Sequence, residues 1–202
     1  MRKELIVALY KITATRQKYI DEAAWDRCKS TIQTIKDLVD EYNEELNRID
    51  FAGAYTTNEE INKELSELIE EAGRNRSIRT EIKRILTPVL EDVTIDWPTV
   101  YDCVQHIMFH GGFSNDELMG KFHQEKYNEY VSKLSDILGF EFSDKKPMLP
   151  SAIIPPLIWA FDDSVTMDWL KRYSKPEYRG KELPKRLKLN FPSAMEILEE
   201  LD

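Results

Sequence analysis

The sequence predicts an all-α protein, and three observations lead to this prediction. Apolar residues recur at helical spacing through most of the first 139 residues, and none of that stretch reads as a convincing strand. Only 7 of the 202 residues are glycine, which argues against a sheet protein with many tight turns. Prolines cluster after residue 140, where the helical periodicity fades. We therefore expect an irregular helical bundle around one long helix, followed by a proline-rich, irregular C-terminal segment.

The long helix is expected over about residues 21–49. Its apolar residues alternate in steps of three and four, as in a coiled coil, without an intervening proline or glycine. This heptad seam consists of Trp25, Cys28, Ile32, Ile35, Val39, Tyr42, Leu46 and Ile49. Five further helices are enough to bury one such seam, so the long helix is interpreted as the spine of the body. Any part of it that extends beyond the body is where we expect a partner or a second subunit.

Shorter helices are expected on both sides of this spine. An amphipathic helix containing Leu5, Ile6, Leu9, Tyr10 and Ile12 precedes it and should end near residues 13–16. Residues 51–58 are predicted to form a loop. The next helix should run from a cap at position 57 or 58 to 72, before Gly73, and another should span about 77–90.

The remaining helices of the body are predicted from their caps. Pro98 suits the first turn of a helix that should reach His110 and stop at the following glycine pair. Ser114 and Glu117 have the spacing of a capping box, which predicts a helix from there to Gly139.

The predicted organisation is a helical body over 1–139 with an extension, 140–202, packed on it as part of one structural domain. Residues 140–156 should be an extended, apolar connection. A short helix capped at 162–164 should follow and reach Leu170. Ser193 and Glu196 predict a last helix near the C-terminus.

Composition limits the classes of function. The net charge of −9 disfavours nucleic acid and anionic membranes as general partners and would favour a basic partner. An acidic surface is also an ordinary means of keeping a protein soluble, and this simpler interpretation is preferred. No apolar run reaches the ~18 residues of a membrane span, and the first residues lack a signal-peptide pattern. Two cysteines do not make a disulfide framework, so we expect a cytoplasmic protein with reduced thiols.

The most specific chemical pattern is a stripe of Cys103, His106 and His110. On a helix these side chains fall within about 60° of one another, and a thiolate with two imidazoles suits zinc. Asp102 could act as a further ligand or hydrogen-bond a ligating histidine, and His123 could reach back from the next helix. The same pattern is also typical of core-facing Cys103 and His106 with a histidine at a helix C-terminus.

A second candidate site is a face of glutamates that could chelate magnesium: Glu60, Glu64, Glu67 and Glu71. The motif Glu64-x-x-Glu67 resembles the first carboxylate motif of the all-α nucleotide pyrophosphohydrolases. Their second motif is Glu-x-x-Asp, but Thr99 stands where the glutamate before Asp102 should be, so the family is not assigned. The alternative is an ordinary solvated helix face.

A third candidate is the basic segment 171–188, which holds eight basic and two acidic residues. Its interaction residues are Lys171, Arg172, Tyr173, Lys175, Tyr178, Arg179, Lys181, Lys185, Arg186 and Lys188. Interleaved tyrosines are compatible with stacking on single-stranded nucleic acid. Binding to the acidic body of this protein, or of a neighbouring subunit, is favoured because that body would repel a polyanion.

The sequence thus favours a non-enzymatic helical module for protein–protein interaction, of the assembly, adaptor or inhibitor type, without a cofactor. It would act through helix faces and charge, on a protein partner or by self-association into an oligomer. The alternative is a metal-dependent hydrolase, for example on nucleotides, using zinc or magnesium at one of the first two sites.

Overall fold

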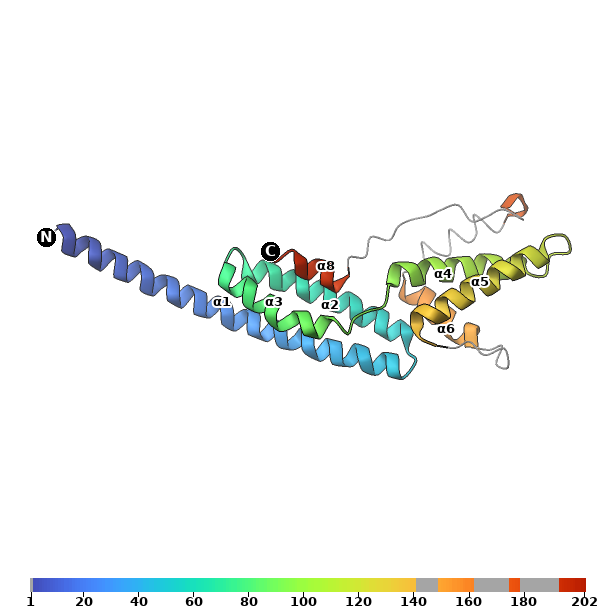
Figure 1. Cartoon of the computed structure of the whole chain (residues 1–202), viewed down its shortest axis with the longest axis horizontal. Coiled ribbons are helices and arrows are strands. Elements are labelled where there is room, and N and C mark those ends of the chain that lie inside the picture. Colours follow the sequence, from blue (N-terminus) through green and yellow to red (C-terminus); the bar gives the residue numbers. More distant parts are fainter. Residues whose placement is uncertain (1, 141–148, 162–174, 179–192) are drawn as a thin grey trace. The chain divides into compact units, whose positions relative to one another are not determined.

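The computed structural model describes residues 2–140, 149–161, 175–178 and 193–202, and every regular element in them is a helix (Figure 1). This confirms the predicted all-α class. The α-helices are α1 (Arg2–Asn47), α2 (Phe51–Ala72), α3 (Arg76–Leu90), α4 (Trp97–Phe113), α5 (Gly120–Leu138), α6 (Leu149–Ala160) and α8 (Ala194–Glu199). A 3-10 turn, η1, covers Pro176–Tyr178.

Helix α1 is one continuous helix of 46 residues, so the predicted break near residues 13–16 is wrong. Neither glycine nor proline interrupts this stretch. The hydroxyls of Thr13 and Thr15 donate to the carbonyl oxygens of Leu9 and Lys11, each at 2.8 Å. These bonds use the i−4 carbonyls of an intact helix, so the threonines are accommodated without ending it.

The middle of α1 supplies much of its buried surface. Five residues of the heptad seam are buried: Cys28, Ile32, Ile35, Val39 and Tyr42. The helix ends at Asn47, two residues before the predicted end. Ile49 follows in the left-handed region at φ 62° and is 46% exposed, so the last seam position lies outside the helix.

Helix α2 begins at Phe51, so the predicted loop over 51–58 is also wrong. Asp50 starts the helix, since its carboxylate accepts a hydrogen bond from the Gly53 backbone N–H at 3.0 Å. Phe51, Ala54 and Tyr55 are buried in this first stretch. Their burial outweighs the turn-like composition around Gly53, which had suggested a loop.

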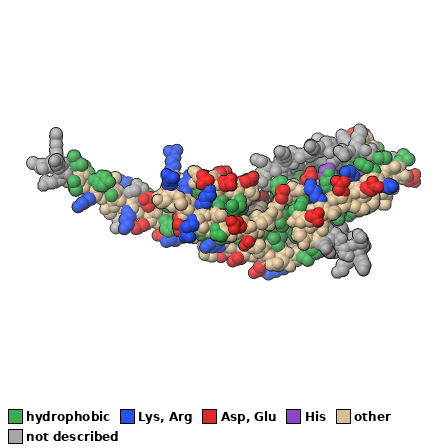
Figure 2. All heavy atoms as spheres, viewed as in Figure 1, with side chains coloured by type: hydrophobic (Ala, Val, Ile, Leu, Met, Phe, Trp, Pro, Cys, Tyr) green, Lys and Arg blue, Asp and Glu red, His purple; other side chains and the backbone are tan. Residues whose placement is uncertain are grey.

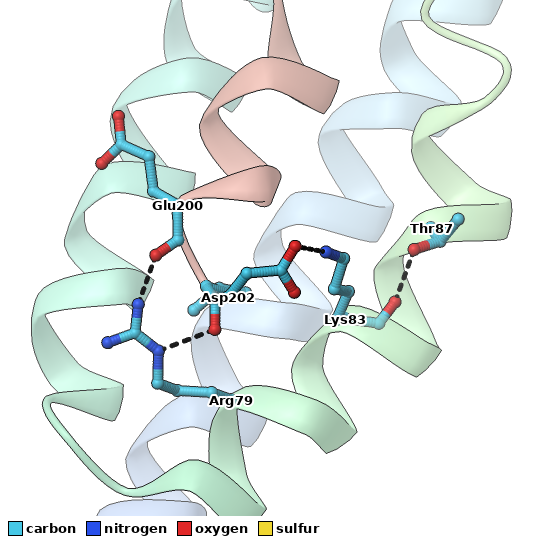
Figure 3. A network of polar contacts seen from close by, with 6 residues as sticks. Arg79, Lys83, Thr87, Glu200 and Asp202 are labelled. Carbon is cyan, nitrogen blue, oxygen red and sulfur yellow. Dashed lines mark hydrogen bonds and ion pairs between the residues drawn. The ribbon is translucent and has the colours of Figure 1, made fainter.

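Helix α3 carries the C-terminal helix α8 (Figure 3). The Arg79 guanidinium donates to the carbonyl oxygens of Leu201 (2.9 Å), Glu200 and Gly73 (2.9 Å). Lys83 forms an ion pair with Asp202 at 2.6 Å. Carbonyl groups at a helix C-terminus have no acceptor role within the helix, and Arg79 donates hydrogen bonds to the two that directly follow α8. The capping box predicted at Ser193 and Glu196 is confirmed.

Helices α4 and α5 form an antiparallel hairpin. Helix α4 continues through Gly111 and Gly112 instead of stopping there, and the α5 residue Tyr127 packs close to Gly111, 3.4 Å from where a Cβ atom would be. Helix α5 begins at Gly120, so the capping box predicted at Ser114 is wrong: that hydroxyl donates to the Gly111 carbonyl oxygen. The predicted stop at Gly139 is confirmed by its φ of +64°.

Residues 149–160 form α6, whereas an extended connection was predicted. Two prolines, Pro155 and Pro156, lie inside this helix. Four apolar side chains are buried along it: Ile153, Ile154, Leu157 and Ile158. Proline fixes φ near the helical value, so burial of this face can outweigh the lost backbone hydrogen bonds. The helix predicted through Leu170 lies outside the described residues.

Contacts between residues divide the chain into two compact units. One comprises 1–43, 57–93 and 192–202, and the other comprises 44–56 and 94–191. The first unit contains most of α1, most of α2, and all of α3 and α8. The second unit contains α4, α5 and α6. The division proposed from the sequence, at 139, remains a prediction.

Candidate functional site

Among the described residues, most of the large apolar side chains that are exposed lie on the amino-terminal overhang, which we define as residues 2–20 of α1. Every side chain described at positions 6–16 is exposed, although five of them are large and apolar. Their exposed fractions are Ile6 64%, Val7 53%, Leu9 55%, Tyr10 76% and Ile12 65%. Figure 2 shows hydrophobic side chains gathered at this end of α1. Such a cluster on one helix is typical of an interaction site.

The apolar residues occupy more than one side of the overhang. Counted back from buried Cys28 in steps of seven, one line along α1 passes through Asp21, Ala14 and Val7. Tyr10 lies beside this line, while Ile12 points to the opposite side at ~100° per residue. A helix that is apolar on several sides needs contacts on several sides.

A groove lies where the overhang meets the start of α3. Its volume is about 660 Å³, and α1 contributes Ala14, Lys18, Asp21 and Trp25 to its lining. The α3 end contributes Asn75 and Ile78, among others. The apolar surface of the overhang therefore continues into a concave site on the same unit.

Asn75 fixes one carboxylate in this groove. Its side-chain oxygen accepts from the Ile78 backbone N–H at 3.2 Å and so caps α3. Its side-chain nitrogen donates to Asp21 at 2.9 Å. One amide thus both starts α3 and orients a negative charge, which favours a cationic group in the groove.

The residues of the predicted zinc stripe lie in and beside the α4–α5 hairpin. The Nδ1 atoms of His110 and His123 are 2.9 Å apart and both side chains are buried. His106 stacks on Tyr130, with ring centroids 3.9 Å apart, and its Nε2 lies 3.7 Å from Asp102. Within the described residues, no group of three or more His, Cys, Asp and Glu side chains could hold a metal ion.

The titration behaviour of this cluster follows from its burial. Desolvation lowers the pKa of His110 to about 4, helped by the neighbouring His123 and His106. Desolvation raises the pKa of the Cys103 thiol to about 11. A thiol with that pKa is protonated at neutral pH, whereas metal binding and nucleophilic attack use the thiolate.

The four glutamates of the predicted magnesium site on α2 differ in their partners and in their exposure. Glu71 accepts from the Thr31 hydroxyl at 3.0 Å, which ties α2 to α1, and Glu67 pairs with Lys63 at 3.6 Å. Glu60 is exposed and Glu64 half-buried. In the described chain these carboxylates are not gathered into a metal-binding group.

Most of the basic segment lies outside the described residues, including Lys171, Arg172, Tyr173, Arg179, Lys181, Lys185, Arg186 and Lys188. Lys175 is described and exposed, and the backbone at Tyr178 belongs to η1. The proposed binding of this segment to an acidic surface stays a prediction.

The residues of the overhang were predicted to form a separate helix, and none of them was named as a site. The available signal was the composition of 5–12, where apolar residues cover too much of the helix for one packed face. The groove gave no such signal, because Asn75 and Ile78 are distant from α1 in the sequence.

None of the described helices has the length and apolar composition needed to cross a membrane. Comparison of the chain with protein-family models, curated proteins and solved structures finds no match.

Proposed function

We propose that this chain is a non-enzymatic helical interaction module and that the amino-terminal overhang of α1 is its docking element. The observation that carries the proposal is the exposure of Ile6, Val7, Leu9, Tyr10 and Ile12, each more than half exposed on one helix. Large apolar side chains gathered in this way are costly to leave in water.

Electrostatics also supports a role in binding proteins. Residues 1–20 hold five basic residues and one acidic residue, a net charge of +4, whereas the whole chain carries −9. The overhang is therefore basic, whereas the rest of the chain is acidic, so a partner meets two regions of opposite charge. This arrangement steers the approach of a partner and fixes its orientation.

The chemistry of the buried side chains supports a non-enzymatic role. The two cysteines are fully buried, and the pKa of each thiol is raised by desolvation. His110 and His123 are hydrogen-bonded to each other in an aromatic surrounding. These features are typical of a packed interior, and none of these groups is placed to meet a substrate.

Site-specific photocrosslinking in the cells that encode the protein tests the proposal. A photoreactive residue at Leu9 or Ile12 should yield a discrete protein adduct, because both positions face outward on the overhang. The same residue at exposed Glu91, on the same unit, is the matched control and should yield none.

A charge substitution then tests the contact itself. Leu9→Glu should abolish the adduct formed from position 12, whereas Thr15→Glu, also exposed on the overhang, should leave it. If no adduct forms from either apolar position, the overhang is not a docking element and the proposal fails.

A further inference from the structure

We infer that the Val7–Tyr10–Ala14 side of the amino-terminal overhang pairs with the same side of a second copy of this chain, in antiparallel orientation. The inference rests on the proposed function and names one partner for the docking element. It concerns only the side that continues the buried line of α1. The side that carries Leu9 and Ile12 stays available to another protein.

The spacing of this side is the same in both directions. Positions 3, 7, 10, 14, 17 and 21 alternate in steps of four and three, beginning and ending with four. An inverted copy therefore places Tyr10 against Ala14 and Ala14 against Tyr10 in one register. Large and small side chains then face each other, which suits close helix packing.

The charges agree with the inverted register. It brings the helix position of Lys3 next to that of Asp21 at both ends of the pair. In a parallel pair Lys3 would meet Lys3 and Asp21 would meet Asp21, and such like-charge contacts are unfavourable. The antiparallel arrangement thus replaces two repulsions by two attractions.

The groove receives the end of the second helix in this arrangement. Ala14 and Lys18 belong both to the overhang and to the groove, and the groove residue Asp21 follows the overhang directly, so a helix laid along one enters the other. Asp21 is already oriented there by Asn75 at 2.9 Å. The basic first residues of one copy would therefore reach a fixed carboxylate and the apolar wall formed by Trp25 and Ile78.

The pairing closes on itself. In a two-fold arrangement each copy uses the same patch, so two copies satisfy each other and no chain of molecules grows. The overhang is roughly 30 Å long at ~1.5 Å per residue. With the groove at each end, the pairing covers about five helical turns of each copy.

Sedimentation of the full chain over a range of concentrations tests the inference. The wild type should form a dimer. Tyr10→Glu should weaken dimerisation at least tenfold, because it places a charge between the two paired helices. Ala8→Glu is the matched control: it inserts the same charge at an exposed position on the side of the helix away from Tyr10, and the dimer should persist.

A charge exchange tests the orientation. Lys3→Glu should weaken the dimer about tenfold by setting a glutamate near Asp21. Adding Asp21→Lys to that variant should restore it. Circular dichroism should show unchanged helix content in every variant, so that loss of the dimer is not loss of the fold.

The results separate this inference from the proposed function. A wild type that is monomeric at all concentrations, or a dimer unaffected by Tyr10→Glu, overturns the second-copy pairing. If that monomer still forms the adduct from position 12, the docking function stands with another partner. Binding of the monomer to anionic vesicles, lost in Tyr10→Glu, would replace the second copy by a membrane surface.

Discussion

The Nδ1 atoms of His110 and His123 lie 2.9 Å apart inside the α4–α5 hairpin, where the two side chains are 1% and 0% exposed. At this separation one imidazole Nδ1 donates its proton and the other Nδ1 accepts it, so the accepting ring must be neutral. The aromatic rings of Phe109, Phe113 and Phe122 surround the pair. A proton added to the accepting ring would set two N–H groups against each other in an apolar site.

This relationship predicts that acid destabilises the fold. Burial lowers the pKa of His110 to about 4, while an unfolded histidine titrates near ~6.5. Below pH ~6.5 His110 binds a proton in the unfolded chain but stays neutral in the folded chain. The free energy of unfolding should therefore fall by about 1.4 kcal/mol per pH unit between these two pKa values. Urea denaturation from pH 7 to pH 5 measures this slope.

The control is His110→Phe, which removes the titrating group. Its free energy of unfolding should depend less on pH over the same range, even if the variant is less stable at pH 7. An equal slope in the variant and the wild type would show that other groups cause the acid sensitivity.

Arg79 should be the residue that holds the C-terminal helix in place. Arg79→Ala removes two hydrogen bonds to carbonyl oxygens at the end of α8 and a third to the Gly73 carbonyl oxygen, which should cost about 1–3 kcal/mol. Faster amide hydrogen exchange in α8 would locate the effect. Arg84→Ala on the same helix removes only an exposed pair with Glu81, which solvent screens, and should change the stability much less.

The two cysteines should be unreactive in the native state. Both are 0% exposed, and desolvation raises the pKa of each thiol, so little thiolate is present near neutral pH. A thiol reagent at pH 8 should label neither Cys28 nor Cys103 in folded protein and both in urea. Rapid labelling of native Cys103 would contradict the packed interior described for the hairpin.

Two glycines should respond in opposite directions to the same substitution. Gly112 lies inside α4 with open space around its Cα, so Gly112→Ala should stabilise the protein by about 0.5–1 kcal/mol. Gly139 ends α5 at φ +64°, a conformation that costs alanine roughly 1–2 kcal/mol. Thermal unfolding of both variants checks the signs, and the same sign for both would contradict the assigned helix ends.

The helical class was predictable because periodicity and low glycine content act over long stretches. Helix ends were predictable where one residue decides them, as at Gly139 and Ser193. Predictions from local composition failed where distant packing decides the conformation. Phe51 and Tyr55 are buried and keep α2 helical through a turn-like sequence, and buried Leu157 does the same for proline-rich α6.

The candidate site was less predictable than the fold. The spacing of His110 and His123 suggested that they could meet, and the hairpin brings them into contact. The sequence could not show that Cys103 would be fully buried. Nor could it show that α1 would extend beyond the start of α3, because the position of Asn75 beside Asp21 depends on how three helices pack.

Because α1 is continuous, the number of residues between them fixes the direction in which the docking face, the Val7–Tyr10–Ala14 side of the overhang, points relative to the groove. Since successive residues turn by ~100°, one residue inserted between Tyr10 and Ala14 would swing the tip away from the line that leads into the groove. Seven inserted residues would return it to nearly the same direction, one two-turn step further out. The docking face is therefore defined by residue count as much as by residue type, and changes in length there should act periodically on binding.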